Sequence, residues 1–338
     1  MSARHWIIIF CFVATSALAD SPQQMTSIGD LLLESGETLR NCEVGYRTAG
    51  TLNADKSNVI IFPTWFTGTS GDLLKFELIG PGKLADTDLY YVIAIDALGN
   101  GVSSSPSTST SQPGAQFPDI SIGDMVNSQF ILLTKHLGIN HALAVTGISM
   151  GGMQAFQWIG QHPEFMDKAV PIEGSPRMTS YDLLQWQTHE TAIQMMQDAN
   201  ISNRKISEFL ASANLLTLWT PGYFVENISP EAFPEYLAEA VQNYAQLDVN
   251  NYLSQLRAMM DHNVYSHDAT GARPYAQKVK SELLVIGSTS DHMVNPVPGK
   301  KFSQSIGADY IAIENNCGHM GSTCNAGEVA AIVGTFLK

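Results

Sequence analysis

The sequence predicts an α/β fold, with a doubly wound, mostly parallel sheet and an inserted helical lid. Two observations carry this prediction. Short β-branched apolar runs alternate with segments whose apolar residues recur at helical spacing, which is typical of parallel strands joined by crossover helices. One long helical stretch, over residues 178–266, interrupts the alternation. The 338 residues suffice for one sizeable domain with such an insertion.

In the first part of the core, residues 20–177, the predicted strands are apolar runs bounded by proline, glycine or polar loops. A helix is predicted over 119–138, with Gly138 in the place of a capping glycine, and another helix begins at residue 150. The predicted strands cover 58–62, 89–96, 141–149 and 167–174.

The lid is predicted over residues 178–266, because the pattern there is helical and contains no convincing strand. The second part of the core, residues 267–338, returns to the alternating pattern. Strands are predicted over 281–288 and 308–314, and a closing helix over 325–338. The lid is expected above the carboxyl-terminal edge of the sheet.

The first 19 residues have the form of a secretory signal peptide. Arg4 precedes an apolar run over 7–18, and Ala17-Leu18-Ala19 has the small-x-small form of a cleavage site before Asp20. A membrane anchor is the alternative, but spanning a bilayer takes about 20 apolar residues. The sequence therefore predicts a periplasmic or secreted protein without stable membrane insertion.

The charge of the chain argues against nucleic-acid and anionic-membrane partners, because the formal net charge is −14 and no basic patch appears. A zinc site is not expected either. No cysteine pair has ligand spacing, and His189-Glu190 lacks the second histidine of the H-E-x-x-H motif. The sequence thus predicts a protein with no metal and no cofactor.

Export would favour disulfide formation, because disulfides persist in oxidising compartments. Cys11 lies in the predicted signal peptide, which leaves Cys42, Cys317 and Cys324. Cys317 and Cys324 are close enough in sequence to pair across a short loop. Cys42 would then be a buried thiol in a strand. Three free thiols are the alternative.

The segment GISMG, residues 147–151, joins a predicted buried strand to a predicted helix. A serine between glycines at such a turn is the G-x-S-x-G arrangement of a serine nucleophile. The turn strains the serine backbone and leaves no room for bulky neighbours, so small residues flank Ser149. Its hydroxyl would lie at a helix N-terminus, where the helix dipole favours negative charge. A glycine-rich helix cap is the alternative.

A serine nucleophile needs a base, and the base needs an acid that orients it. With a G-x-S-x-G serine at a strand–helix turn, the chain order is serine, acid, histidine. Asp291 follows the predicted strand 281–288, and His319 follows the predicted strand 308–314. Because parallel strands present their carboxyl ends at one edge, we predict a catalytic triad of Ser149, His319 and Asp291.

Acyl chemistry also requires an oxyanion hole of backbone N–H groups. We assign one to Met150, the residue after the nucleophile, and the other to Phe66 in the loop after the strand 58–62, with Trp65 as the alternative. The expected partner is a small-molecule acyl substrate, and homodimer formation is left open. The candidate walls of the substrate pocket are Trp65, Trp219 and Met320.

The segment GISMGGMQAFQW, residues 147–158, resembles the nucleophile segment of the homoserine O-acetyltransferase-like branch of the α/β-hydrolase superfamily. Residues 33–62 resemble the opening strands of that branch. Residues 117–139 resemble its helix before the nucleophile strand, and residues 247–264 resemble the end of its lid. The resemblance implies the α/β-hydrolase fold, Ser149 as nucleophile, Asp291 and His319 as its partners, and chemistry through an acyl-enzyme.

Other residues depart from the acetyltransferase pattern. In the acetyltransferases an aspartate follows the catalytic histidine and helps to hold the amino group of homoserine, whereas here Met320 follows His319. Their lid carries an arginine just before the aspartate that aligns with Asp248, where this chain reads Gln246-Leu247-Asp248. Residues 63–72 and 100–107 instead resemble hydrolase members of the same branch.

These observations predict an exported serine hydrolase that cleaves an ester or a similar acyl bond. An exported enzyme meets little acetyl-CoA, and an acyl-enzyme without a bound acceptor is resolved by water. One alternative is an O-acyltransferase that uses homoserine or another small alcohol. Another is a non-catalytic binding protein on a hydrolase fold, against which the complete set of three catalytic residues argues.

Overall fold

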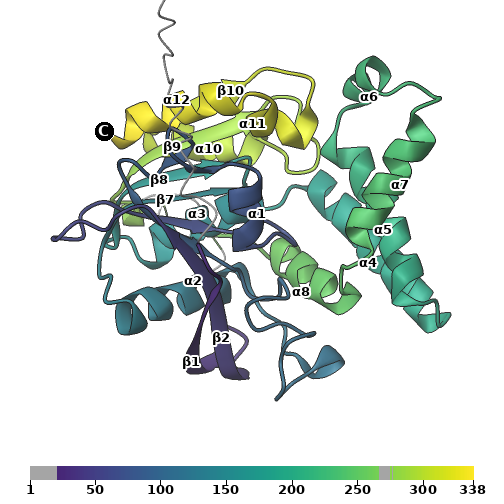
Figure 1. The fold of residues 1–338 in the computed structure, drawn as a ribbon, viewed down its shortest axis with the longest axis horizontal. Helices are drawn as coiled ribbons and strands as arrows, with labels where there is room; N and C mark the ends of the chain where they lie inside the picture. The colour runs from purple at the N-terminus through teal and green to yellow at the C-terminus, as the bar shows by residue number, and fades with distance from the viewer. Residues whose placement is uncertain (1–20, 266–274, 276) are drawn as a thin grey trace, which may run out of the picture.

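The computed structural model describes residues 21–265, 275 and 277–338, so the predicted signal peptide and the boundary between lid and second core segment lie outside the described residues. An eight-stranded sheet with the order β1-β2-β6-β3-β7-β8-β9-β10 forms its centre (Figure 1). Its strands are β1 (Gln24–Leu32), β2 (Thr38–Ala49), β3 (Val59–Pro63), β6 (Tyr91–Ile95), β7 (Ala142–Ile148), β8 (Met166–Ile172), β9 (Glu282–Ser288) and β10 (Asp309–Ile313). A separate two-stranded sheet pairs β4 (Ile79–Gly80) with β5 (Ala85–Asp86).

The sheet is antiparallel at one side and parallel over the rest. β2 pairs antiparallel with both β1 and β6, whereas each neighbouring pair from β6 to β10 is parallel. All five residues of β3 are buried, as expected for a parallel strand covered on both faces. The predicted α/β class with a mostly parallel sheet is confirmed. As a result, the loops that follow β3, β7, β8, β9 and β10 meet at one edge.

Helices cover both faces of the sheet. In Figure 1, α12 lies on the opposite side of the sheet from α2. Side chains of α2, α3 and α10 join the strands in one apolar cluster, and those of α1 and α12 join them in a second. The helices of this core are α1 (Ser70–Lys75), α2 (Ile122–Ile131), α3 (Met150–Gln161), α10 (Val297–Ile306), α11 (Gly321–Cys324) and α12 (Ala326–Leu337).

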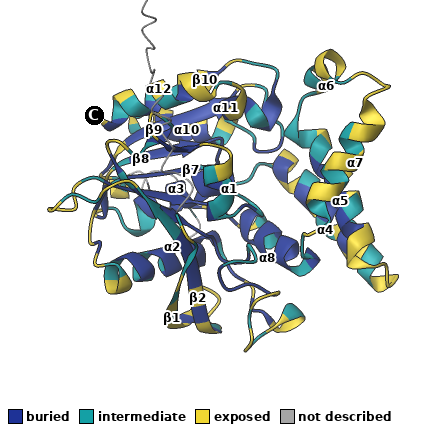
Figure 2. Cartoon of the chain, viewed as in Figure 1, coloured by how far each residue is buried: buried dark blue, intermediate teal, exposed yellow. Residues whose placement is uncertain are grey.

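The two apolar clusters follow from the alternation of side chains along each strand. Val145 of β7 belongs to the cluster that contains α3, and its neighbour Ala144 belongs to the cluster that contains α12. Figure 2 shows the middle of the sheet, β7 and β8 included, as deeply buried, whereas β1 at its edge is largely exposed. Trp158 of α3 is fully buried, and its indole N–H donates to Gln129 Oε1 of α2 at 2.8 Å, so the polar atom of this large side chain is satisfied.

Residues 180–260 carry the helices α4 (Ser180–Asp198), α5 (Asn203–Leu218), α6 (Pro221–Asn227), α7 (Phe233–Tyr244) and α8 (Val249–Met260). We call them the lid. The helices α4 to α7 project from the body of the molecule, and α8 lies between them and the core (Figure 1). Neither α6 nor α7, both wholly described, contains a buried residue (Figure 2). No described helix is long and apolar enough to cross a bilayer.

The predicted strands and helices differ from the structure by a few residues at their ends, and a physical reason is clear for two of them. The helix predicted over 119–138 begins after the capping box of Ser121 and passes at residue 132 into the π-helical turn η3 (Leu132–His136). The strand predicted over 167–174 ends at Ile172, because Glu173 takes a left-handed backbone conformation with φ 47°. The short 3-10 helices are η2 (Gly114–Gln116) and η4 (Gly318–Met320).

Candidate active site

Ser149 forms the turn between β7, which ends at Ile148, and α3, which begins at Met150. Its φ of 59° and ψ of −123° lie in a region that non-glycine residues seldom adopt. The backbone N–H of Ser149 donates to the carbonyl oxygen of Ile172 at 2.9 Å, which ties the turn to β8. Such strain persists only where the surroundings impose it, and it clusters at functional sites.

The glycines on either side of Ser149 are required by close backbone contacts. A Cβ atom at Gly147 would lie 2.4 Å from the Gly151 carbonyl, and one at Gly151 would lie 2.6 Å from the Pro63 carbonyl oxygen. Any larger residue would therefore separate α3 from β7 or from the end of β3. The G-x-S-x-G spacing thus reflects packing at a tight turn, as the sequence predicts.

The structure brings Ser149, His319 and Asp291 together in one hydrogen-bonded row. His319 Nε2 lies 2.8 Å from Ser149 Oγ, and His319 Nδ1 lies 2.6 Å from Asp291 Oδ2. His319 belongs to η4, after β10, and Asp291 to the loop after β9. The three residues are 9%, 6% and 5% exposed, so the row is almost wholly shielded from solvent.

Asp291 is fixed by its own loop as well as by the histidine. Its Oδ1 accepts the backbone N–H groups of Met293 and Val294, both at 2.9 Å, while Oδ2 faces His319. The carboxylate therefore cannot rotate without loss of these bonds. With Asp291 ionised, Nδ1 of His319 carries the proton and Nε2 is free to accept one from the serine.

Opposing effects act on the pKa of His319. Burial lowers it, because burial disfavours the charged imidazolium. The charge of Asp291 and its hydrogen bond raise it, and the charges of Glu173 and Asp182 act in the same direction. The carboxylates outweigh burial, and the pKa of His319 is raised above its ordinary 6.5. The surroundings of His319 thus favour its protonated form.

The loop after β3 lies against the start of α3, where an oxyanion hole would form. Gln154 of α3 donates from Nε2 to the Thr64 carbonyl oxygen at 3.0 Å, which places Trp65 and Phe66 beside the helix that Met150 begins. The Phe66 ring packs against the lid, with its centre 4.6 Å from that of Tyr252. The Trp65 ring packs the other way, 5.8 Å from Phe76.

A sequence profile described as alpha/beta hydrolase fold matches residues 58–322, well over half of the chain. The chain belongs to the α/β-hydrolase family. The chain is also 30% identical to a probable esterase of Corynebacterium glutamicum, over 90% of this chain and 92% of the relative. It is 31% identical to the ethyl acetate hydrolase of Pseudomonas veronii, over 80% of this chain and 81% of that protein.

Acyltransferases are similar to this chain at the same level of identity. A homoserine O-acetyltransferase of Methanosalsum zhilinae is 30% identical over 91% of this chain and 71% of that protein. Among solved structures, an acetylester hydrolase from Corynebacterium glutamicum superposes with a TM-score of 0.86 at 27% identity, covering 94% of this chain and 95% of the other. The predicted family is therefore confirmed, and the chain is an enzyme, either a hydrolase or an acyltransferase.

Glu173 is a buried acid beside the predicted triad, and the sequence analysis did not single it out. It follows β8 directly, is 2% exposed, and accepts hydrogen bonds from Ser322, three residues after His319. Asp182 of α4 is also buried and accepts the backbone N–H of Asn295 at 3.1 Å, in the loop that carries Asp291. An acid directly after the apolar run 169–172 was the available signal for Glu173.

Gln255 of α8 is a second residue that sequence analysis missed. Its Oε1 accepts the backbone N–H of Thr67 at 2.8 Å, and its Nε2 donates to the Leu98 carbonyl oxygen at 2.9 Å. Gln255 is fully buried, and Thr67 has a φ of 62°. The lid thereby holds the loop that contains Phe66. A polar residue on the buried face of a lid helix was the only sequence signal.

The lid and a disulfide both constrain the segment around His319. Cys317 and Cys324 form a disulfide in the structure. The remaining described cysteine, Cys42, is a free thiol buried in β2, and burial raises the pKa of this thiol to about 12. A Cβ atom at Gly318 would lie 2.9 Å from the carbonyl oxygen of Leu218, so the lid touches this segment. Trp219 follows Leu218 and stacks on Tyr223, whereas Met320 ends η4.

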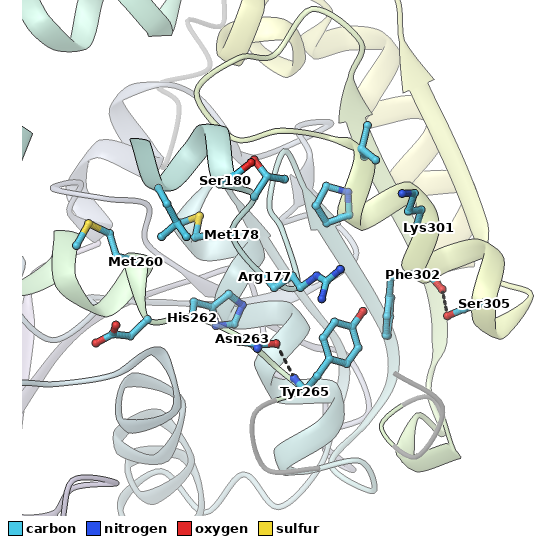
Figure 3. Close-up of a pocket in the computed structure, with 15 residues that line it drawn as sticks. Arg177, Met178, Ser180, Met260, His262, Asn263, Tyr265, Lys301, Phe302 and Ser305 are labelled. Carbon is cyan, nitrogen blue, oxygen red and sulfur yellow. Dashed lines mark hydrogen bonds between the residues drawn. The ribbon is translucent and has the colours of Figure 1, made fainter. Parts of the chain in front are cut away.

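A separate pocket of about 860 Å³ lies among the start of α4, the end of α8 and α10 (Figure 3). The described residues that line it include Arg177, Tyr265 and Lys301, and none of them belongs to the triad. The guanidinium carbon of Arg177 lies 5.7 Å from the centre of the Tyr265 ring. Among the described residues, no group of three or more His, Cys, Asp or Glu is placed to hold a metal ion.

Proposed function

We propose that this α/β hydrolase is an exported serine esterase that cleaves small carboxylic esters through a Ser149–His319–Asp291 triad. One observation carries the proposal. The serine, histidine and aspartate are joined by two short hydrogen bonds, of 2.8 Å and 2.6 Å, in the order that nucleophilic catalysis requires. Binding alone needs no such row, which argues against a non-catalytic role.

In the first half of the reaction, Ser149 Oγ attacks the ester carbonyl while His319 Nε2 takes its proton. The oxyanion that forms is held by the backbone N–H groups of Met150 and Phe66, with Trp65 as the alternative to Phe66. Each such donor contributes about 3 kcal/mol to the transition state. His319 then gives the proton to the leaving alcohol oxygen, and the acyl group remains on Ser149.

In the second half, water attacks the acyl-enzyme and His319 Nε2 takes a proton from it. The carboxylic acid leaves and the proton returns to Ser149 Oγ, so atoms and charges balance over the cycle. Asp291 keeps the imidazole in one tautomer and stabilises the imidazolium in both halves. The ester and one water molecule are the only reactants that these steps consume.

We propose an acetyl or similarly short acyl group, because two similar proteins are named ethyl acetate hydrolase and acetylester hydrolase. The small exposed fractions of Ser149 and His319 support a narrow site. Trp65, Trp219 and Met320 are the proposed walls. Export is proposed from the signal-like pattern of residues 1–19, and a disulfide beside the site supports an oxidising compartment.

The similarity to homoserine O-acetyltransferases supports a second candidate function, an acyl transfer from Ser149 to a small alcohol. Both functions share the first half-reaction and differ in what attacks the acyl-enzyme. Met320 directly after His319 supports hydrolysis, because the resemblance implies that the acetyltransferases need an aspartate there for the amino group of homoserine. Water is then the remaining acceptor.

The experiment that tests the proposal uses the mature protein and p-nitrophenyl esters of increasing acyl length, with and without homoserine, beside the Ser149→Ala variant. Serine-dependent acid release that peaks at short acyl groups and is indifferent to homoserine supports an esterase. Acylated homoserine as the product establishes the acyltransferase instead. Failure of a fluorophosphonate to label Ser149, together with no acid release from any ester, would leave only a binding role.

A further inference from the structure

Glu173 combines two unfavourable features at one residue beside the nucleophile strand. Its backbone has φ 47°, a conformation that costs free energy for any residue other than glycine. Its carboxyl group is 2% exposed, and a buried carboxyl group is costly unless it is hydrogen-bonded. The backbone N–H of Glu173 donates to the Ile286 carbonyl oxygen of β9 at 2.8 Å, so the residue is held between two strands. Strain and burial together at one site point to a function.

The contacts of Glu173 lead directly to the histidine segment. Its Oε1 accepts the Ser322 backbone N–H at 2.8 Å, and its Oε2 accepts the Ser322 hydroxyl at 2.5 Å. Ser322 lies in α11, within the loop that the Cys317–Cys324 disulfide closes. A Cβ atom at Gly321 would lie 2.9 Å from Oε1, so the segment packs tightly onto the carboxylate. Glu173 therefore anchors the chain just after His319.

The charges around His319 come from three elements. Asp291 lies in the loop after β9, Glu173 follows β8, and Asp182 lies in the first turn of α4. Burial raises the pKa of Glu173 from 4.5 to about 7, and the charge of Asp291 acts in the same direction. The charge of His319 and the hydrogen bonds from Ser322 act against this rise. Glu173 is thus most readily ionised when His319 carries a proton.

We propose that Glu173 is a positioning residue for His319, which it serves by anchoring Ser322 and by placing a second negative charge near the imidazolium that forms during the reaction. The inference rests on the proposed function, because it assigns His319 the role of base. Asp291 contacts the imidazole directly and sets its tautomer. Glu173 acts through Ser322, which follows His319 in the chain, and through its negative charge. The carboxylates of Asp291 and Glu173 therefore have distinct roles.

The test compares Glu173→Gln with the matched control Glu282→Gln, an exposed glutamate at the start of β9. The glutamine keeps the size of the side chain and an acceptor for Ser322 N–H, but it removes the charge. Because an anion favours the protonated imidazole, its removal should move the acid limb of the kcat/KM profile downward by roughly half to one pH unit. We expect kcat to fall about 3- to 10-fold with KM changed less than about twofold. The control should match the wild type.

A second variant, Ser322→Ala, removes one of the two anchoring bonds and leaves every charge in place. We expect a smaller fall in kcat, again with little change in KM, and it tests the anchor even if Glu173→Gln fails to fold. Wild-type kcat and pH profiles in both variants, with changes only in melting temperature, would reduce Glu173 to a structural residue. A wild type whose ester cleavage does not depend on Ser149 would instead overturn the proposed function, so the two failures are distinguishable.

Discussion

His319 Nε2 lies 2.8 Å from Ser149 Oγ, although 170 residues separate the two in the chain. The serine reaches this point from the strained turn between β7 and α3, and the histidine from η4 after β10. The turn that carries Ser149 is closely packed, because Gly147 and Gly151 leave no room for larger side chains. The strained backbone of Ser149 thus holds its hydroxyl within hydrogen-bond distance of the histidine that we propose as its base.

Replacement of Ser149 by alanine should abolish ester cleavage while the fold persists. The nucleophile is lost, and we expect kcat to fall by about 10⁴-fold or more. The alanine keeps the Cβ atom and the backbone conformation, so the melting temperature should change little. Initial rates and a thermal melt on the same sample check both expectations. A well-folded variant that retains over about one hundredth of the rate would contradict the assignment.

The pH profile should show an acid limb above the ordinary histidine value. His319 must be neutral to take the serine proton, and its pKa is raised above 6.5, mainly by Asp291 against the effect of burial. Thus kcat/KM should fall as the pH falls through that raised value. Asp291→Asn should move the limb to lower pH and lower kcat by about 10⁴-fold. A limb that stays in place in this variant would show that another group controls the titration.

Replacement of Gln255 by leucine should slow the reaction without unfolding the lid. The variant leaves the Thr67 N–H and the Leu98 carbonyl without their partner and loosens the loop that carries Phe66. Because one oxyanion donor contributes about 3 kcal/mol, partial misplacement should lower kcat by about 10- to 100-fold. Gln242→Leu, at an exposed position of α7, is the matched control. Equal effects in both variants would argue against a role for Gln255 at the loop.

Loss of the Cys317–Cys324 disulfide should lower activity more than it lowers global stability. The bond closes a short loop around His319, so its loss frees the histidine while the rest of the core stays packed. We expect kcat to fall several-fold in a Cys317→Ser/Cys324→Ser variant, at temperatures where a melt shows it folded. A reducing agent should lower the wild-type rate and leave this variant unchanged. Parallel losses of activity and stability would contradict the prediction.

Glu173 should make the protein less stable as the pH rises through its titration range. Its pKa is raised from 4.5 to about 7, chiefly by burial, so between these values the folded state holds a proton that the unfolded state has released. The free energy of unfolding therefore falls with increasing pH in this window. Across this window the free energy of unfolding of Glu173→Gln should increase relative to that of the wild type, by on the order of 1–3 kcal/mol. Urea unfolding at several pH values measures it, and a difference that does not vary with pH would refute the assignment.

The tight turn at Ser149 and the convergence of Ser149, Asp291 and His319 were predictable from the sequence because each leaves a local signal. The glycines around Ser149 mark a tight turn, and Asp291 and His319 each follow an apolar strand. Parallel strands align their carboxyl ends, so residues after successive strands meet without further information. Pairing of Cys317 with Cys324 was favoured by their short separation and by the predicted export to an oxidising compartment.

Glu173 and Gln255 were not predictable, because their roles depend on neighbours far away in the chain. Glu173 meets Ser322 across 149 positions, and Gln255 meets Thr67 across 188. In the sequence, one was the end of a strand and the other a polar residue in an amphipathic helix. Only the assembly of the sheet and the packing of α8 against the core decide which backbone groups these side chains contact.

The sequence by itself determined the α/β class, the serine turn and the three residues of the hydrogen-bonded row, since periodicity, glycine spacing and chain order are local properties. The tertiary structure alone decided the distances in that row, the burial that acts on the pKa values of His319 and Glu173, and the contact of the lid with the loop after β3. These quantities depend on how closely distant segments pack and on how much water they exclude. Desolvation and charge–charge effects therefore appear only once the chain is folded.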